Sequence, residues 1–227
     1  MEPVILSNIP FNVNIELLMK RIRLKKDNSH ADDFRHLVEE AQAIARPKAM
    51  YRPVYIESKD DDHVVLEGVS LKSRILKVNL ENAYRVFPFV TTCGMELEDW
   101  ARAKEDMLLR FWAERIKETA LHSAIGLFNK YVSEEFSIEK KSTMTPGSLE
   151  DWPIEEQRAL FEIVGNTKDA IGVELTESLM MKPVHSVSGI LFPTEVNFES
   201  CQLCQREKCP GRRAPYDEDL YDRRYSK

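Results

Sequence analysis

Three of the four cysteines in the chain lie within nine residues of one another. Cys201, Cys204 and Cys209 form a C-x2-C-x4-C pattern followed by Pro210, whereas Cys93 stands alone. A C-x2-C loop can turn two thiolates toward one metal, with backbone N–H groups directed at the sulfurs. A disulfide framework would more often spread its cysteines along the chain. Tight clustering in a reducing compartment therefore indicates a metal site.

Three thiolates are one ligand short of a closed tetrahedral site. Cys93 is the candidate for the fourth ligand, because it lies at the expected end of a strand, where a returning tail can meet it. The spacing predicts a four-cysteine site that holds an iron–sulfur cluster or a zinc ion, and spacing alone does not separate the two metals. The alternatives are free thiols for the trio and a small buried residue for Cys93.

The composition excludes several classes of protein. The chain has 227 residues and is 43% hydrophobic, which is too apolar for a disordered protein. Its net charge of −6 argues against a general nucleic-acid binder, because phosphate contacts need a basic face. The sequence has no uncharged apolar run near the roughly 18 residues of a membrane-spanning helix, and no secretion signal is recognisable at residues 1–10. We expect a cytoplasmic protein without a membrane or nucleic-acid partner.

Hydrophobic periodicity predicts a mixture of helices and strands. Helices are expected at 15–25, 29–45, 95–131 and 154–164, and strands at 50–66 (a hairpin that turns at 59–62), 69–75, 85–92, 173–177 and 184–192. The helix at 95–131 has the strongest pattern and is expected to break near Asp106. The stretch 142–151 is expected to be a loop, and 210–227 an extended arm or a disordered tail.

Several short motifs follow one another in a fixed order. They are TPG at 145–147, PIEEQ at 153–157, GVELTES at 172–178, MKP at 181–183 and SVSG at 186–189, with IPF at 9–11, ARP at 45–47 and GMELE at 94–98 before them. In this order they resemble the activation domain of vitamin B12-dependent methionine synthase, including stand-alone members of that family. The resemblance covers roughly residues 9–192.

The resemblance implies an α+β fold, with a twisted antiparallel sheet, packed helices and one long central helix. It also implies a role beside a corrinoid methyltransferase. Cobalamin in such enzymes cycles between Co(I) and methyl-Co(III), and Co(I) is occasionally oxidised to inactive Co(II). The family's activation domain binds S-adenosylmethionine and presents its methyl group to cobalt while an external donor supplies one electron.

One loop departs from the family pattern. An Arg-x-x-x-Gly-Tyr segment holds S-adenosylmethionine in the family, and alignment through Gly147 places Thr143 at the arginine position and Ser148 at the tyrosine position. A threonine hydroxyl cannot replace an arginine that pairs with a carboxylate, which argues against S-adenosylmethionine binding. Lys140 or Lys141 could substitute for the missing arginine.

The expected ligand cleft joins this loop to the two later strands. Its candidate residues are Thr143, Gly147, Ser148, Glu177, Ser178, Ser186 and Ser188. Strand alternation places Ser186 and Ser188 on one face. They either form a polar wall of the cleft or pair with backbone groups in an ordinary hairpin.

These interpretations divide the chain into an activation-domain-like part, 1–198, and a cysteine-rich segment with a charged arm, 199–227. We expect an accessory protein for a corrinoid methyltransferase that assists the reductive return of Co(II), with electron transfer through the cysteine-bound cluster. The alternative is a non-catalytic module that binds a corrinoid protein and carries structural zinc.

Overall fold

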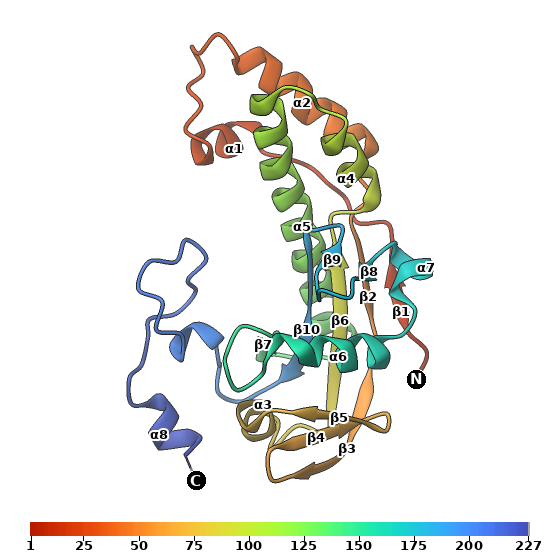
Figure 1. Ribbon diagram of the computed structural model, residues 1–227, viewed down its shortest axis with the longest axis vertical. Helices are drawn as coiled ribbons and strands as arrows, with labels where there is room; N and C mark the ends of the chain where they lie inside the picture. The colour runs from red at the N-terminus through yellow and green to blue at the C-terminus, as the bar shows by residue number, and fades with distance from the viewer. Residues whose placement is uncertain (227) are drawn as a thin grey trace.

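The computed structural model describes residues 1–226, in which eight strands form one antiparallel sheet (Figure 1). The strands of this sheet are β1 (Val4–Leu6), β2 (Lys48–Tyr51), β3 (Val54–Asp60), β4 (His63–Leu66), β5 (Val69–Lys72), β6 (Arg85–Thr92), β7 (Lys141–Met144) and β10 (Ser186–Pro193). A separate small hairpin joins β8 (Glu174–Leu175) to β9 (Met181–Lys182). Because every pairing is antiparallel, the expected sheet type is confirmed.

Helices cover this sheet and extend beyond it. They are α1 (Ile15–Arg21), α2 (Ala31–Ile44), α3 (Arg74–Asn79), α4 (Met95–Arg102), α5 (Met107–Glu135), α6 (Gln157–Val164), α7 (Thr167–Ile171) and α8 (Leu220–Arg224), with short 3-10 turns at Ile154–Glu156 and Ser200–Gln202. None of these helices combines the length and apolar character needed to cross a membrane.

The central strand is β6, which pairs with β2, β3 and β10. All of its residues except Arg85 are buried, because α5 packs on one face of the strand and α6 on the other. Alternation sends Phe87 and Phe89 toward the α5 side and Val86 and Val90 toward the α6 side. The continuous apolar run in the sequence therefore reflects a strand that is buried on both faces.

Helix α5 is the long central helix that the sequence predicts. The expected break falls at Asp106, whose side chain accepts hydrogen bonds from the N–H groups of Leu108 and Leu109 and so starts a new helix. The first part of α5 packs against α2 and α4 beyond the end of the sheet (Figure 1). The molecule has the outline of a crescent, with α1 and α2 at one tip and the C-terminal arm near the other.

Two local expectations differ from the structure. The stretch expected as a loop at 142–151 begins with β7, which pairs with the end of β10 through Ile190 and Met144. The strand expected at 69–75 stops at Lys72, because the Ser73 side chain caps α3 by accepting from Leu76 N. Pairing partners and a cap residue therefore override the local polarity pattern.

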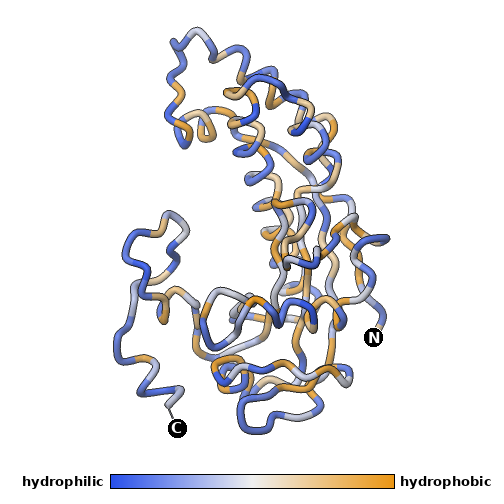
Figure 2. The backbone as a smooth tube through the Cα atoms, in the orientation of Figure 1, coloured by the Kyte–Doolittle hydropathy of each residue, from blue (hydrophilic) through white to orange (hydrophobic). Residues whose placement is uncertain are grey.

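The C-terminal arm, residues 199–226, ends in ordered structure. Figure 2 shows a mostly hydrophilic chain here, yet Tyr225 is fully buried and packs with Phe198 in the core cluster beneath α3 and α6. The Tyr225 hydroxyl donates to Asn79 Oδ1 at 2.9 Å, and Arg74 Nε donates to the Tyr225 carbonyl. The described part of the arm is therefore anchored to the domain and is not a disordered tail.

Candidate functional site

The turn from β6 into α4 holds Cys93, the isolated cysteine. Its N–H donates to the His185 carbonyl at 3.0 Å, and its side chain is fully buried among apolar residues of α2, α4 and α5. Burial raises the pKa of the Cys93 thiol to about 12, so the group stays protonated near neutral pH. The adjacent Gly94 has φ +93°, and a Cβ there would lie 2.5 Å from the Arg46 carbonyl oxygen, so only glycine makes this turn without strain.

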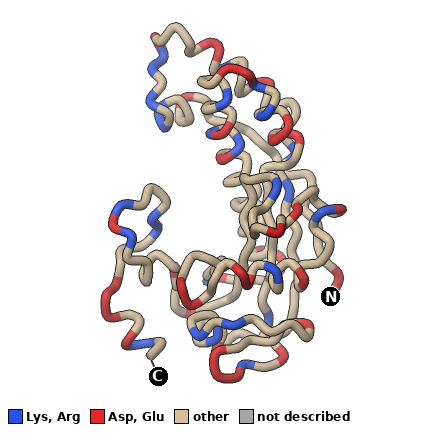
Figure 3. Tube along the Cα trace, in the orientation of Figure 1, with Lys and Arg blue, Asp and Glu red and all other residues tan. Residues whose placement is uncertain are grey.

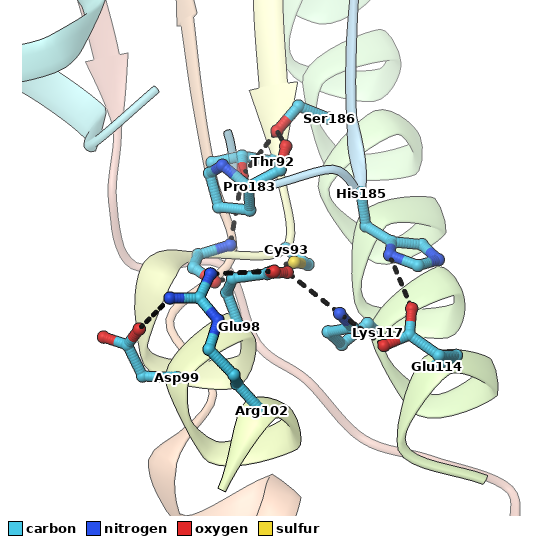
Figure 4. A network of polar contacts seen from close by, with 11 residues as sticks. Thr92, Cys93, Glu98, Asp99, Arg102, Glu114, Lys117, Pro183, His185 and Ser186 are labelled. Carbon is cyan, nitrogen blue, oxygen red and sulfur yellow. Dashed lines mark hydrogen bonds and ion pairs between the residues drawn. The ribbon is translucent and has the colours of Figure 1, made fainter. Parts of the chain in front are cut away.

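Ser186 and Ser188 belong to the interior of this end of the sheet. Ser186 Oγ lies 2.8 Å from the Pro183 carbonyl oxygen and 2.9 Å from Thr92 Oγ1 (Figure 4). Ser188 Oγ accepts from Gln157 Nε2 on α6 at 3.0 Å. Both serines are buried. Ser186 contacts a backbone carbonyl and a side chain, whereas Ser188 pairs with a side chain, so the role of the two serines in a ligand cleft stays a prediction.

A buried lysine lies next to the Cys93 turn. Lys117 on α5 is 3% exposed, and its Nζ lies 2.9 Å from Glu98 Oε2 and 2.7 Å from Glu114 Oε1 (Figure 4). Burial alone would lower the pKa of Lys117, but hydrogen bonds and charge from the two glutamates outweigh it and raise the pKa. These side chains line a cavity of about 230 Å³ between α4 and α5.

Sequence reasoning did not single out this ion cluster. The available signal is helical spacing, because Lys117 shares the face of α5 that buries Ala113, Ala120 and Ala124. A lysine at such a position has to be paired, and Glu114 stands one turn before it on the same helix. Glu98 comes from α4, so it could be assigned only once the packing of the two helices was known.

His185 faces the same cluster from the strand side. Its Nδ1 lies 3.5 Å from Glu114 Oε2 and makes no hydrogen bond with any group of residues 1–226. Burial, followed by the nearby positive charge of Lys117, lowers the pKa of His185. These two effects outweigh the negative charge of Glu114, which raises the pKa. His185 is therefore mostly neutral at pH 7.

The loop after β7 carries the glycine of the TPG motif at 145–147. Gly147 has φ +79° and a Cβ there would lie 2.9 Å from Ile154 Cδ1, while its N–H donates to the Trp152 carbonyl at 2.8 Å. Ser148 Oγ bonds to Thr145 Oγ1 at the tip of the loop. Thr143 pairs with Leu191, which packs on the α5 side of the sheet, so Thr143 faces that side.

The C-terminal arm closes a pocket over this loop. The pocket has a volume of about 410 Å³ and one wall formed by residues 148–151. The facing wall comes from the arm and includes Leu203, Cys204 and Tyr216. The structure therefore brings Ser148 and Cys204, two predicted site residues, to one pocket.

Arg212 organises the cysteine loop. Its guanidinium donates to the carbonyl oxygens of Cys201 at 2.9 Å and Cys204 at 3.0 Å, and also to those of Arg206 and Ala214. The N–H of Arg213 points at Cys201 Sγ, 3.4 Å away. Figure 3 shows that basic residues surround this loop, although the chain as a whole is acidic.

Other predicted residues lie apart from this pocket. Glu177 and Ser178 are exposed in the β8–β9 turn, where the Glu177 carbonyl accepts from Arg158. Lys141 contacts Ser133 on α5 and Lys140 lines a different groove, so neither lies at the Ser148 loop.

The four cysteines are likewise divided. Cys93 packs with α2, α4 and α5, whereas Leu203 of the C-x2-C loop packs with the cluster that contains Tyr225. Cys201, Cys204 and Cys209 are half-buried. Within residues 1–226, no three His, Cys, Asp or Glu side chains stand together in a group that could hold a metal ion.

Comparison with known proteins identifies two relationships. Residues 147–209 match the family model described as vitamin B12 dependent methionine synthase, activation domain. Among solved structures, the MetH reactivation domain bound to AdoHcy matches with a TM-score of 0.61 and 14% sequence identity, over 88% of this chain and 81% of that chain. No curated protein sequence matches the chain. The structural match confirms the α+β fold expected from the sequence.

Proposed function

Because the chain belongs to the vitamin B12-dependent methionine synthase activation domain family, we propose that it is an accessory protein that reactivates a corrinoid methyltransferase. Its target is the partner's cobalamin in the inactive Co(II) state. One electron from an external donor reduces Co(II) to Co(I), which is the form that accepts a methyl group. The chain assists this step by docking on the corrinoid-binding protein.

The pocket between the Ser148 loop and the cysteine loop is the observation that carries the proposal. The family match begins at Gly147 and ends at Cys209, so the matched segment contains the wall at 148–151 and the Cys204 part of the facing wall, whereas Tyr216 lies beyond it. Tyr225 and Asn79 hold the arm in the position that closes it. A partner that docks at this pocket therefore contacts both the Ser148 loop and the cysteine loop.

The residues at this loop do not fit the family's mode of holding S-adenosylmethionine. The arginine position is occupied by Thr143, which faces the α5 side of the sheet and not the pocket. Ser148 is engaged with Thr145, and no arginine lines the pocket. We therefore derive no step from S-adenosylmethionine bound to this chain, and we expect any binding to be weak.

The cysteine trio is the proposed metal-binding element. Thiols suit iron–sulfur clusters and zinc, and the N–H of Arg213 already points at Cys201 Sγ, as occurs around metal thiolates. The side chains do not converge in the described conformation, so metal binding has to draw them together. An iron–sulfur cluster, when bound, supplies one-electron transfer.

The second candidate function is a corrinoid-protein-binding module with structural zinc in the same cysteines. It is favoured by the four carbonyl contacts of Arg212, which make the cysteine loop a rigid element. Under this alternative the arm stabilises the docking surface and carries no electrons.

Metal analysis under anaerobic conditions distinguishes the two functions. We expect iron and acid-labile sulfide in the purified protein, with a visible absorption band that bleaches on reduction. Stoichiometric zinc with a featureless visible spectrum would support the structural module. Absence of both metals from the folded protein would contradict both versions of the cysteine site.

Reactivation itself is tested with a cobalamin-loaded methionine synthase that lacks an activation domain of its own. We expect the chain to speed the loss of the Co(II) absorption spectrum when a low-potential chemical reductant is present. The loss of the Co(II) spectrum should be slower with the Cys204→Ser variant. The His36→Gln variant, changed at an exposed site on α2, should give the same rate as the unaltered chain. A rate that does not depend on the chain would overturn the proposal.

A further inference from the structure

A second hollow lies at the opposite end of the sheet from the Cys93 turn. Strand β6 begins there at Arg85, and the end of β10 lies beside it because Leu191 pairs with Phe87. Residues 136–140, which follow α5 directly, complete a groove of about 790 Å³. This volume lies within the range of small-molecule sites in proteins, which is roughly 300–1,000 Å³.

Arg85 is the distinctive residue of this groove. Its guanidinium carbon lies 4.5 Å from the ring centroid of Phe136 and 5.6 Å from that of Phe87. Throughout residues 1–226 no carboxylate is in ion-pair range of Arg85, and its side chain makes no hydrogen bond within this part of the chain. Cation–π contact with these two rings holds the guanidinium in the groove while its N–H groups remain available to two oxygens of an anion.

Two tyrosines supply aromatic surface beside Arg85. Tyr55 stands directly opposite Arg85 in the β3–β6 pair and is 56% exposed. Tyr84 is 82% exposed, and Lys59 Nζ lies 5.9 Å from its ring centroid. Lys59 is held there by bonds to two backbone carbonyl oxygens, those of Glu81 and Ala83. Aromatic faces left in solvent next to a fixed cation are typical of a binding surface.

We propose that this groove binds a planar aromatic anion. The anionic group pairs with the Arg85 guanidinium, and the ring stacks on Tyr55 and Tyr84. Lys140 adds a second positive charge to the groove. The negative charges of Glu139 and Glu195, which also line it, offset that of Lys140 and disfavour ligands with several negative charges. The groove shares no residue with the pocket lined by Ser148 and Cys204, so this site stands apart from the proposed reactivation function.

Two fluorescent probes that differ by one charge test the proposal. The anion 8-anilinonaphthalene-1-sulfonate and its neutral counterpart N-phenyl-1-naphthylamine share the same aromatic body. We expect the anion to bind with one-to-one stoichiometry and more tightly than the neutral probe. Arg85→Met should weaken binding of the anionic probe by about tenfold or more, which is the loss expected for a charge-assisted hydrogen bond. Binding of the neutral probe should not change. Tyr84→Ala should weaken the binding of both probes.

The matched control lies at a groove of similar size beside α1. That groove has a volume of about 800 Å³ and includes the exposed Lys20 but no aromatic residue. Lys20→Met should leave binding of both probes unchanged. Equal effects of Lys20→Met and Arg85→Met, or tight binding of the neutral probe alone, would overturn the proposal. So would a dimer in solution that Tyr84→Ala dissociates, because the groove would then be an interface between two copies of the chain.

Discussion

The hydroxyl group of Tyr225 donates a 2.9 Å hydrogen bond to Asn79 Oδ1, which joins the end of the C-terminal arm to α3. Both side chains are buried, although they are separated by 146 positions in the sequence. The arm therefore holds its place through a specific buried contact as well as through the packing of the Tyr225 ring against Phe198. The pocket that contains Cys204 depends on this anchor.

Removal of the anchor should destabilise the whole domain. We expect Tyr225→Ala to lower the free energy of unfolding by about 3 kcal/mol or more, as for other large buried aromatic residues. Tyr225→Phe keeps the ring but leaves Asn79 Oδ1 without its donor, and should cost about 1–2 kcal/mol. Urea denaturation measures both values. Tyr216→Phe, at an exposed site in the same arm, is the control and should change stability little. Equal stability of all three variants would mean that the arm is not anchored.

The buried lysine gives a second prediction. Lys117→Met leaves Glu98, which is 12% exposed, without its buried cation, and should lower stability by about 3 kcal/mol. Lys130→Met removes an exposed lysine from the same helix, paired with Glu134, and should cost less than about 0.5 kcal/mol. Urea denaturation at pH 7 compares the two variants. A loss of similar size in both would contradict the structure of the cluster.

The same cluster predicts a loss of stability at high pH. The pKa of Lys117 is raised in the folded protein above its ordinary value of 10.5. Its contribution to stability is therefore complete below pH 10.5 and is lost as pH rises through the higher folded pKa. The unaltered chain should lose more stability above pH 10.5 than Lys117→Met loses. Parallel pH profiles for the two proteins would exclude this assignment.

Much of this architecture follows from local patterns in the sequence. The hairpin of β3 and β4 turns within the acidic run at 60–62, and α4 and α5 are separated near Asp106, where the sequence predicts a break. The burial of β6 on both faces also follows from its continuous apolar run. In each of these cases the residues that indicate the feature lie within about ten positions of it in the sequence.

Other features depend on partners that are distant in the sequence. Strand β1 is three residues long, and only its pairing with β2 defines it. Tyr225 follows a mostly charged stretch of the arm and gives no periodic pattern. The candidate site shows the same division. The sequence alone indicates Ser148 and the cysteine trio as candidates, whereas the meeting of Ser148 and Cys204 in one pocket emerges only from the fold.

His185 predicts a loss of stability at acid pH. Burial lowers its pKa below the ordinary value of 6.5, so between the folded pKa and 6.5 the unfolded chain binds more protons than the folded chain. Stability should therefore fall as pH drops below 6.5. His185→Asn should flatten this part of the profile, and His36→Asn, at a 78% exposed site, should not. Thermal unfolding between pH 5 and pH 7.5 tests both; an unchanged slope in His185→Asn would contradict the assignment.

Arg212 gives a prediction about local order in the arm. Arg212→Met removes all four hydrogen bonds to loop carbonyls, whereas Arg206→Met removes an exposed side chain that makes no ion pair within residues 1–226. We expect proteolysis within residues 201–214 to become about tenfold faster in Arg212→Met, because local opening becomes easier. The global unfolding midpoint should change little while Tyr225 remains buried. Equal cleavage rates in the two variants would show that Arg212 does not order the loop.

The separation of the cysteines predicts which of them a metal requires. Cys201, Cys204 and Cys209 share one loop, whereas the thiol of Cys93 is sealed among the side chains of α2, α4 and α5. Its pKa of about 12 also opposes the deprotonation that a metal ligand needs. Serine at position 201, 204 or 209 should therefore reduce the bound iron or zinc, while Cys93→Ala should retain it and cost about 1 kcal/mol of stability through a small cavity. Metal analysis of the four variants, purified in parallel without oxygen, gives the answer. Loss of metal in a folded Cys93→Ala protein would show that the arm closes onto the end of β6 when the metal binds.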